Sequence, residues 1–198
     1  MMLGKCRQSW KLIVEALDKS SLWLVNQDER FLQSISNSRL LNRFSKVLLM
    51  ATYFGDGYLW GFVGLYLILF GGARAHNYVL IGLAISIVNI TAFRLVKTTL
   101  GRPRPLFQPK SFKMRFRVVD DFSFPSGHAT IAFGVAYTIM QAYTHLWWAW
   151  LGVYLASALI GISRIFVQEH YPSDVLGGAL IGTFVSAALM PYFESIVF

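Results

Sequence analysis

Residues 163–174, with the sequence SRIFVQEHYPSD, place Arg164, His170 and Asp174 between two long apolar segments. Ionisable side chains are costly near hydrocarbon, so a group of them at the ends of membrane-spanning helices indicates a functional site. A histidine can attack phosphorus if an acceptor holds the proton on its other ring nitrogen. Asp174 can be that acceptor if Pro172 begins a helix, because Asp174 then lies in the first turn, where the helix dipole favours a carboxylate. The segment therefore predicts a histidine nucleophile, a carboxylate partner and a nearby cation.

A second segment, PSGHAT at residues 125–130, leads from a turn directly into an apolar helix. Pro125 and Gly127 favour a tight entry, and the free N–H groups of a helix start form an anion site together with the helix dipole. Ser126 adds a hydroxyl donor, and His128 can exchange a proton near pH 7. A helix-capping histidine with only a structural role is the alternative.

A third segment, KTTLGRPRP at residues 97–105, carries cations next to prolines. Proline disfavours helix in the residue before it, so the chain should leave the membrane here. We interpret Lys97 and Arg104 as phosphate ligands, because an ammonium offers a point charge and a guanidinium a bidentate fork. For Arg102, an interfacial anchor that binds lipid phosphates is the preferred interpretation.

Apolar segments long enough to cross a membrane must position these groups. Hydrophobic residues make up 55% of the chain and aromatic residues 16%, with a mean hydropathy of +0.49. A spanning helix needs about 20 mainly apolar residues and satisfies its own backbone hydrogen bonds. The candidate spans are residues 47–71, 78–96, 127–144, 146–163 and 175–193. We predict an all-α integral membrane bundle of about five transmembrane helices, within a range of four to six.

The order of spans predicts where the three polar segments lie. One follows the second span, one precedes the third, and one joins the fourth to the fifth. With five spans, all three fall on one membrane face and can form a single site.

The N-terminal part of the chain has a different pattern. Trp10, Ile13, Val14 and Leu17 recur at helical spacing opposite charged residues, as in an amphipathic helix within the headgroup layer. A helix packed against the bundle is the alternative. We therefore expect residues 1–45 to be an amphipathic, interfacial segment and residues 46–198 to be the transmembrane catalytic domain.

Asp56 lies between two glycines near the start of the first span, where an acid should not face lipid. Capping of a helix that begins near Gly57 is our preferred interpretation, and contact with the site is the alternative. Small residues one helical turn apart, such as Gly178 and Gly182, predict close packing between helices.

Together the three polar segments resemble the signatures of the type 2 phosphatidic acid phosphatase superfamily, the lipid phosphate phosphatases related to vanadium haloperoxidases. The family patterns are Lys-x6-Arg-Pro, Pro-Ser-Gly-His and Ser-Arg-x5-His-x3-Asp. They are matched by Lys97 with Arg104-Pro105, by residues 125–128, and by Ser163-Arg164 with His170 and Asp174. The resemblance runs from about Gly55 to the C-terminus.

The resemblance implies a two-step phosphoryl transfer that needs no metal and no cofactor. It makes His170 the nucleophile, Asp174 its orienting partner and His128 the acid that protonates the leaving oxygen. The residues that it places around the phosphoryl oxygens are Lys97, Arg104, Ser126, Gly127 and Arg164. Positioned cations and N–H groups of this kind stabilise the charge on transferring phosphoryl oxygens.

A site at the membrane face predicts an amphiphilic lipid phosphate as substrate. Bacterial members of this size act on undecaprenyl diphosphate, phosphatidylglycerol phosphate, phosphatidate or the phosphates of lipid A, and the sequence does not choose among them. Transfer of the phosphoryl group to an acceptor lipid is the alternative to hydrolysis. Besides the substrate, we expect the protein to contact membrane lipids. We expect no binding of nucleic acid and predict no protein partner.

The distribution of cations and the resemblance disagree about orientation. Of 18 Lys and Arg residues, most lie in residues 5–46 and 97–117, on the face of the site. The positive-inside rule would place that face in the cytoplasm, whereas the resemblance favours the extracytoplasmic face. We expect a multi-pass protein of the bacterial cytoplasmic membrane with an extracytoplasmic site.

Overall fold

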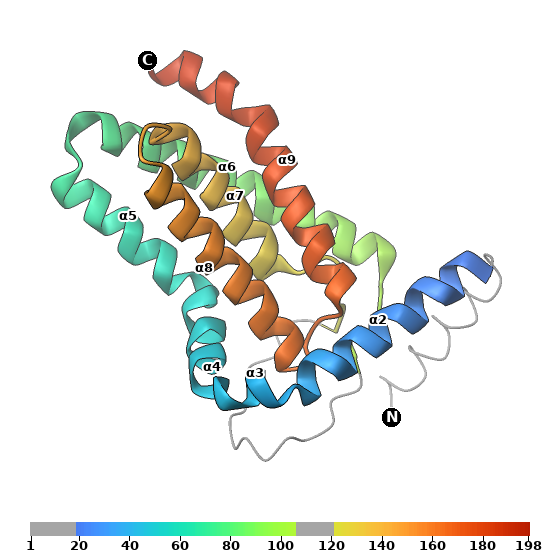
Figure 1. Cartoon of the computed structure of the whole chain (residues 1–198). Helices are drawn as coiled ribbons and strands as arrows, with labels where there is room; N and C mark the ends of the chain where they lie inside the picture. The colour runs from blue at the N-terminus through green and yellow to red at the C-terminus, as the bar shows by residue number, and fades with distance from the viewer. Residues whose placement is uncertain (1–18, 106–120) are drawn as a thin grey trace.

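The structure, a computed structural model, describes residues 19–105 and 121–198 of the chain. Within these ranges the secondary structure is helical, apart from one isolated bridge between Pro103 and Phe122. The helices run side by side as a bundle, and one N-terminal helix lies across its end (Figure 1). The predicted all-α membrane bundle is confirmed.

The helices coincide with the apolar segments of the sequence. They are α4 (Ser45–Tyr53), η1 (Phe54–Tyr58), α5 (Leu59–Phe70), α6 (Gly72–Leu100), α7 (Gly127–Ala142), α8 (Trp147–Phe166) and α9 (Pro172–Val197). Among the described residues, four helical stretches are long and apolar enough to cross a membrane, namely residues 45–70 and helices α6, α8 and α9. The predicted third span corresponds to α7, which has 16 residues. It is shorter than the about 20 residues that a spanning helix needs.

Helix α7 lies between the longer helices and packs against α6, α8 and, most extensively, α9. Small residues allow the α7 and α9 backbones to approach closely. A Cβ atom placed on Gly178 would lie 2.5 Å from the carbonyl oxygen of Ser126, and one on Gly182 would collide with the carbonyl oxygen of Thr130. The predicted packing role of these glycines is therefore correct for α9.

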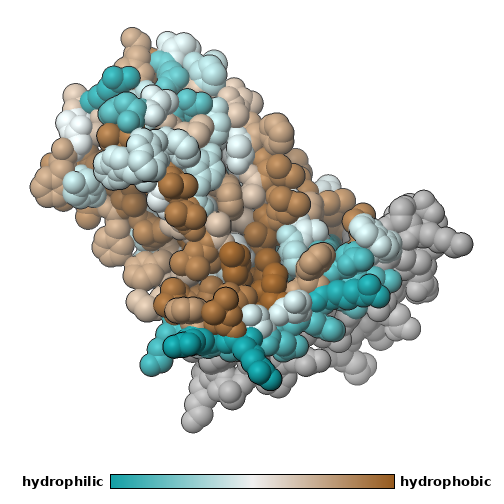
Figure 2. All heavy atoms as spheres, in the orientation of Figure 1, coloured by the Kyte–Doolittle hydropathy of each residue, from teal (hydrophilic) through white to brown (hydrophobic). Residues whose placement is uncertain are grey.

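The outer surface of the bundle is apolar along much of its length, while polar residues gather at its two ends and along the N-terminal helix (Figure 2). Large apolar side chains such as Phe62, Leu83 and Phe184 are well exposed. Hydrocarbon, not water, is the solvent in which such a surface is stable, because lipid-facing helices present apolar side chains outward. The chain is therefore a multi-pass membrane protein.

Helix α2 (Lys19–Asn37) lies across the end of the bundle and contacts α8 and α9; the short α3 (Arg39–Arg43) connects it to α4 (Figure 1). On one strip of α2, Leu32 is buried against Ile165 and Tyr171. Leu24 and Phe31 are exposed. The described part of the N-terminal segment therefore packs against the bundle, and residues 1–18, which include most of the predicted amphipathic helix, lie outside the described residues.

Candidate active site

The three polar segments meet at one end of the bundle, beside α2 (Figure 1). The Ser126 N–H donates a hydrogen bond to the carbonyl of Asp174 at 3.0 Å. Arg104 Nη1 donates to the carbonyl of Glu169 at 3.2 Å. The chain after α6, the start of α7 and the α8–α9 connection therefore share one face, as the number of crossings predicts.

His170 lies in the connection between α8 and α9 and is only 1% exposed. Burial lowers the pKa of His170 well below the ordinary histidine value. The cations of Arg104, Arg164 and Lys97 lower this pKa further, because they oppose another positive charge. The imidazole is therefore neutral at neutral pH, and a neutral ring keeps one nitrogen lone pair available for attack.

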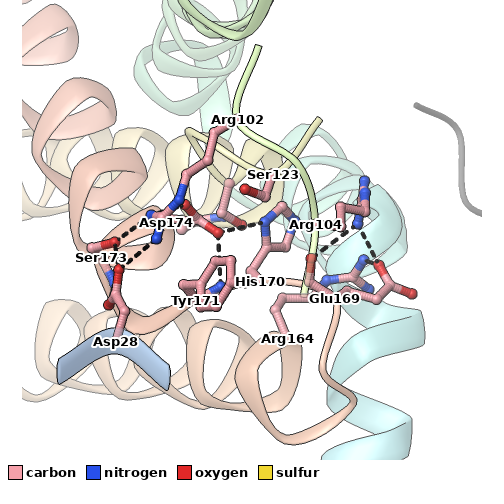
Figure 3. Close-up of polar contacts among 12 residues, drawn as sticks. Asp28, Arg102, Arg104, Ser123, Arg164, Glu169, His170, Tyr171, Ser173 and Asp174 are labelled. Atoms are coloured by element: carbon pink, nitrogen blue, oxygen red, sulfur yellow. Dashed lines mark hydrogen bonds and ion pairs between the residues drawn. The ribbon is translucent and has the colours of Figure 1, made fainter. Parts of the chain in front are cut away.

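The Nδ1 atom of His170 faces the carboxylate of Asp174 (Figure 3), with 3.7 Å between Nδ1 and Oδ2. This separation is too long for a hydrogen bond, and Nδ1 has no hydrogen-bond partner within the described parts of the chain. Asp174 therefore acts on His170 as a neighbouring negative charge. Because Nδ1 faces the acid, Nε2 is the nitrogen left for chemistry.

Asp174 is fully buried in the first turn of α9, which begins at Pro172 as predicted. Its Oδ2 accepts the backbone N–H of Tyr171 at 2.7 Å. Its Oδ1 accepts Arg102 Nη1 at 2.8 Å. A buried carboxylate needs such partners, because an unpaired buried charge is strongly destabilising. Both oxygens of Asp174 are held in place beside His170.

Arg102 is buried, so its interpretation as an interfacial anchor is wrong. Only 7% of the residue is exposed, and its Nη2 lies 2.7 Å from Oδ2 of Asp28. Its guanidinium carbon lies 4.3 Å from the centre of the Tyr171 ring, a typical cation–π arrangement. The arginine joins two carboxylates inside the protein, and the sequence around it gives no sign of those partners.

Asp28 of α2 also belongs to this network, although the sequence analysis did not identify it. Its Oδ1 accepts the backbone N–H of Ser173 at 3.0 Å, and its Oδ2 accepts the Ser173 hydroxyl. The residue is 8% exposed. The one sequence signal was an acid one helical turn before Leu32, on the strip of α2 that faces the bundle.

Two of the remaining cations, Arg104 and Arg164, contact Glu169, a second site residue that the sequence did not predict. The Glu169 Oε2 atom lies 3.2 Å from Arg104 Nη1 and also contacts Arg164 Nη2 (Figure 3). Lys97, in the last turn of α6, is 5% exposed, and its Nζ lies 5.9 Å from the centre of the Phe93 ring. Glu169 occupies a variable position of the third motif, so the motif itself does not identify it.

The start of α7 adds the remaining predicted phosphate ligands. Ser126 caps the helix, and its Oγ accepts the backbone N–H of Ala129 at 3.5 Å. A Cβ atom on Gly127 would lie 3.0 Å from the Phe93 ring. Since Phe93 also faces Lys97, the start of α7 and the end of α6 flank the same aromatic side chain.

His128 contacts Asp56, so helix capping, the preferred interpretation for this acid, is wrong. The His128 Nε2 atom lies 2.6 Å from Asp56 Oδ1. Asp56 belongs to the π-helical turn η1, where Gly57 has φ of +109°, a value that favours glycine. A Cβ atom on Gly55 would lie 3.1 Å from the His128 ring. The turn brings both backbone and carboxylate against the histidine.

Comparison with known sequences finds a family match and related proteins. Residues 75–197 match the sequence model of the PAP2 superfamily. An undecaprenyl-diphosphatase from Sulfolobus acidocaldarius is 30% identical over 146 residues, which cover 71% of this chain and 66% of that protein. A lipid A 1-phosphatase from Rhizobium johnstonii is 34% identical over 104 residues, which cover 46% of this chain and 38% of that protein. The chain thus spans two-thirds or less of these relatives.

Solved structures share the fold. Aquifex aeolicus LpxE superimposes with a TM-score of 0.62 at 26% identity and covers 82% of this chain and 94% of its own. A transmembrane PAP2 type phosphatidylglycerolphosphate phosphatase from Bacillus subtilis superimposes with a TM-score of 0.65 at 21% identity, over 98% of this chain and 96% of its own. The second similarity concerns the fold alone.

Proposed function

Because the chain belongs to the PAP2 superfamily, we propose that it is a membrane-embedded lipid phosphate phosphatase. Its substrate is an amphiphilic phosphomonoester or diphosphate of the kind handled by the related lipid phosphatases. The observation that carries the proposal is the buried, neutral His170, which faces Asp174 and is surrounded by Lys97, Arg104 and Arg164. A nucleophile, its carboxylate partner and cations for an anionic group lie together.

In the first step, the unprotonated Nε2 of His170 attacks phosphorus. A P–N bond forms, the P–O bond to the lipid breaks, and His128 gives its proton to the leaving oxygen. The imidazole gains positive charge as the P–N bond forms, and the Asp174 carboxylate at 3.7 Å stabilises that charge. The products of this step are the free lipid product and a phosphohistidine.

In the second step, water attacks the phosphohistidine. The P–N bond breaks, His128 takes a proton from the water, and inorganic phosphate leaves with His170 restored to its neutral form. The same histidine thus serves as acid and then as base, as in other double-displacement hydrolyses. Asp56, which is hydrogen-bonded to His128 at 2.6 Å, keeps the ring oriented for both steps.

The phosphoryl oxygens are held by groups that converge from three helices and the connections between them. Phosphoryl transfer depends mainly on positioning and on stabilisation of charge that is spread over the equatorial oxygens. The proposed ligands are Lys97, Arg104, Ser126, Gly127 and Arg164. The chain's own cations and backbone N–H groups are sufficient for this role, so we propose that catalysis is metal-independent. Undiminished turnover in excess chelator is expected, and a rate restored only by added divalent metal would contradict it.

We propose that the site faces the extracytoplasmic side of a bacterial cytoplasmic membrane. The test replaces Cys6 with serine and introduces a reporter by Arg30→Cys, because Arg30 is exposed on α2 at the site end of the bundle. A membrane-impermeant maleimide should label this reporter in intact cells. Labelling only after the cells are opened would place the site in the cytoplasm instead.

The decisive experiment measures phosphate release by the purified protein from undecaprenyl diphosphate, phosphatidylglycerol phosphate, phosphatidate and lipid A. At least one substrate should be hydrolysed, and His170→Ala should abolish both turnover and the trapped phosphoenzyme. Substantial activity in a clean His170→Ala preparation would refute the mechanism. Phosphate that reaches an added acceptor lipid without release of inorganic phosphate would identify a phosphotransferase.

A further inference from the structure

Helix α2 contributes a buried acid to the site, although it lies outside residues 75–197, which match the family. Asp28 is 8% exposed and contacts two segments of the catalytic end. Its Oδ2 pairs with Arg102 Nη2 at 2.7 Å, and its Oδ1 accepts the Ser173 N–H at 3.0 Å. An acid with partners this specific, from a helix that crosses the end of the bundle, calls for a role beyond membrane attachment.

The contacts of Asp28 lead to the nucleophile in a short chain (Figure 3). Arg102 holds Asp28 with Nη2 at 2.7 Å and Asp174 with Nη1 at 2.8 Å. Asp174 in turn faces Nδ1 of His170 at 3.7 Å. Three side chains therefore link α2 to the nucleophile, and each link joins charged groups or a charge and a ring nitrogen.

A second connection reaches the same acid through the backbone of α9. Ser173 lies beside Asp174 in the first turn, and both its N–H and its hydroxyl donate to Asp28. The Ser173 hydroxyl oxygen also accepts Arg102 Nη1. Asp28 thus fixes the start of α9 and the arginine together, which limits how the Asp174 carboxylate can move relative to His170.

We propose that Asp28 is a positioning residue, through which the N-terminal helix α2 sets the Arg102–Asp174 pair that orients the nucleophile His170. This inference rests on the proposed function. Arg102 divides its charge between two carboxylates. Without Asp28 its full charge acts on Asp174, which weakens the stabilisation that Asp174 can offer to the charge developing on His170. Side chains that lose a buried partner also lose their fixed geometry.

The test compares purified full-length Asp28→Asn and wild type with a lipid phosphate that wild type hydrolyses. The Asp28→Asn change should lower kcat by about 10- to 100-fold. It should leave KM within about 2-fold, because Asp28 has no described contact with the proposed phosphate ligands Arg104, Arg164 and Lys97. Arg30→Gln is the matched control, since it removes a charge from an exposed position of the same helix. Its kcat should equal that of wild type.

A double-mutant comparison separates positioning from mere support of the fold. In the Asp174→Asn background, Asp28→Asn should cause no further loss of kcat, because its effect passes through Asp174. Equal fold-losses in both backgrounds, or an unchanged kcat in Asp28→Asn, would overturn the inference. If Asp28→Asn does not fold, Ser173→Ala replaces it, with an expected kcat loss of about 3- to 10-fold at constant KM.

The wild-type measurement keeps the two proposals apart. Phosphate release by wild type with a normal kcat in both Asp28→Asn and Ser173→Ala would leave the phosphatase intact and refute the role of Asp28. No phosphate release by wild type from any lipid would refute the proposed function, and the positioning role with it.

Discussion

His128 Nε2 lies 2.6 Å from Oδ1 of Asp56, although 72 residues separate the two in sequence. An ionised carboxylate only accepts hydrogen bonds, so Nε2 carries the proton of this contact. The other ring nitrogen, Nδ1, is then the one that can exchange a proton with the leaving group. In the proposed mechanism, the turn η1 at Phe54–Tyr58 therefore determines which ring nitrogen of His128 transfers the proton.

Replacing Asp56 by asparagine should impair proton transfer by His128 but not phosphate binding. In single-turnover experiments, phosphoenzyme formation from a lipid phosphate should slow by about 10- to 100-fold, since general acid catalysis contributes on the order of 100-fold or more. With p-nitrophenyl phosphate, whose leaving group needs no proton, the first turnover should change little.

The exposed carboxylate of Asp121 provides the control for this prediction. Asp121→Asn should match wild type with both substrates. If Asp56→Asn slows the two substrates equally, Asp56 does not act through the leaving-group proton.

Glu169 neutralises two guanidinium groups at once, because its Oε2 contacts both Arg104 and Arg164. In Glu169→Gln, the buried Arg164 and the partly buried Arg104 lose their countercharge, which is destabilising because an unpaired buried charge is costly. The thermal unfolding temperature should therefore fall in the absence of ligand. Inorganic phosphate should raise it more in the variant than in wild type, because the phosphate charge replaces the missing carboxylate.

The matched variant for Glu169 is Glu194→Gln, in which the lost carboxylate accepts a hydrogen bond from Tyr78. It should show no added response to phosphate. A phosphate response of Glu169→Gln no larger than that of wild type would contradict the placement of Arg104 and Arg164 in the phosphate site.

The pH dependence of kcat/KM should reflect the lowered pKa of His170. Burial and nearby cations hold this pKa well below the ordinary value of 6.5, so the nucleophile keeps its lone pair at pH values where an ordinary histidine is already protonated. Activity should fall only when the pH drops through the lowered pKa. Stability should decline from a higher pH, because the unfolded chain takes up the proton near 6.5.

Two substrates whose phosphate groups have different pKa values separate enzyme from substrate ionisation. If kcat/KM falls on the acid side at the same pH, below 6.5, with both substrates, the titrating group belongs to the enzyme. An enzyme limb at or above that value would be incompatible with a neutral, buried nucleophile.

The contact between α7 and α9 should not tolerate a side chain at Gly178. A Cβ atom there would lie 2.5 Å from a backbone oxygen of Ser126, which cannot move without displacing the start of α7. Gly178→Val should lower stability by about 1–3 kcal/mol or more, the usual cost of overpacking, and should reduce the yield of folded protein in detergent. Gly152→Ala, where a Cβ meets no atom within 4 Å, should be neutral in the same unfolding measurement.

Much of the fold follows from the sequence because each span must satisfy its own backbone in lipid. The apolar segments therefore mark helices directly, and the position of Pro172 marks where α9 begins. The length of α7 was less predictable. Its hydropathy resembles that of a span, but neighbouring helices surround it, so lipid thickness does not set its length.

The partners of the site residues were beyond the sequence for a physical reason. Asp28 pairs with Arg102 across 74 residues, and no periodicity or motif encodes a contact between separate elements. Arg102 was misinterpreted because a cation next to a span has the same pattern whether it binds lipid or a buried acid. For Asp56, contact with the site was only the alternative to capping, because its contact with His128 depends on the unusual backbone of η1.

The shared position of Arg102 between Asp28 and Asp174 also bears on how this protein can diverge. Loss of Arg102 leaves two buried carboxylates, Asp28 and Asp174, without their cation, whereas loss of Asp28 still leaves Arg102 paired with Asp174. Among descendants of this chain, we therefore expect Arg102 to change less readily than Asp28. A shortened protein that begins at residue 75 would retain all three motifs. It would lose Asp28 and Asp56, the two acids that contact residues of these motifs.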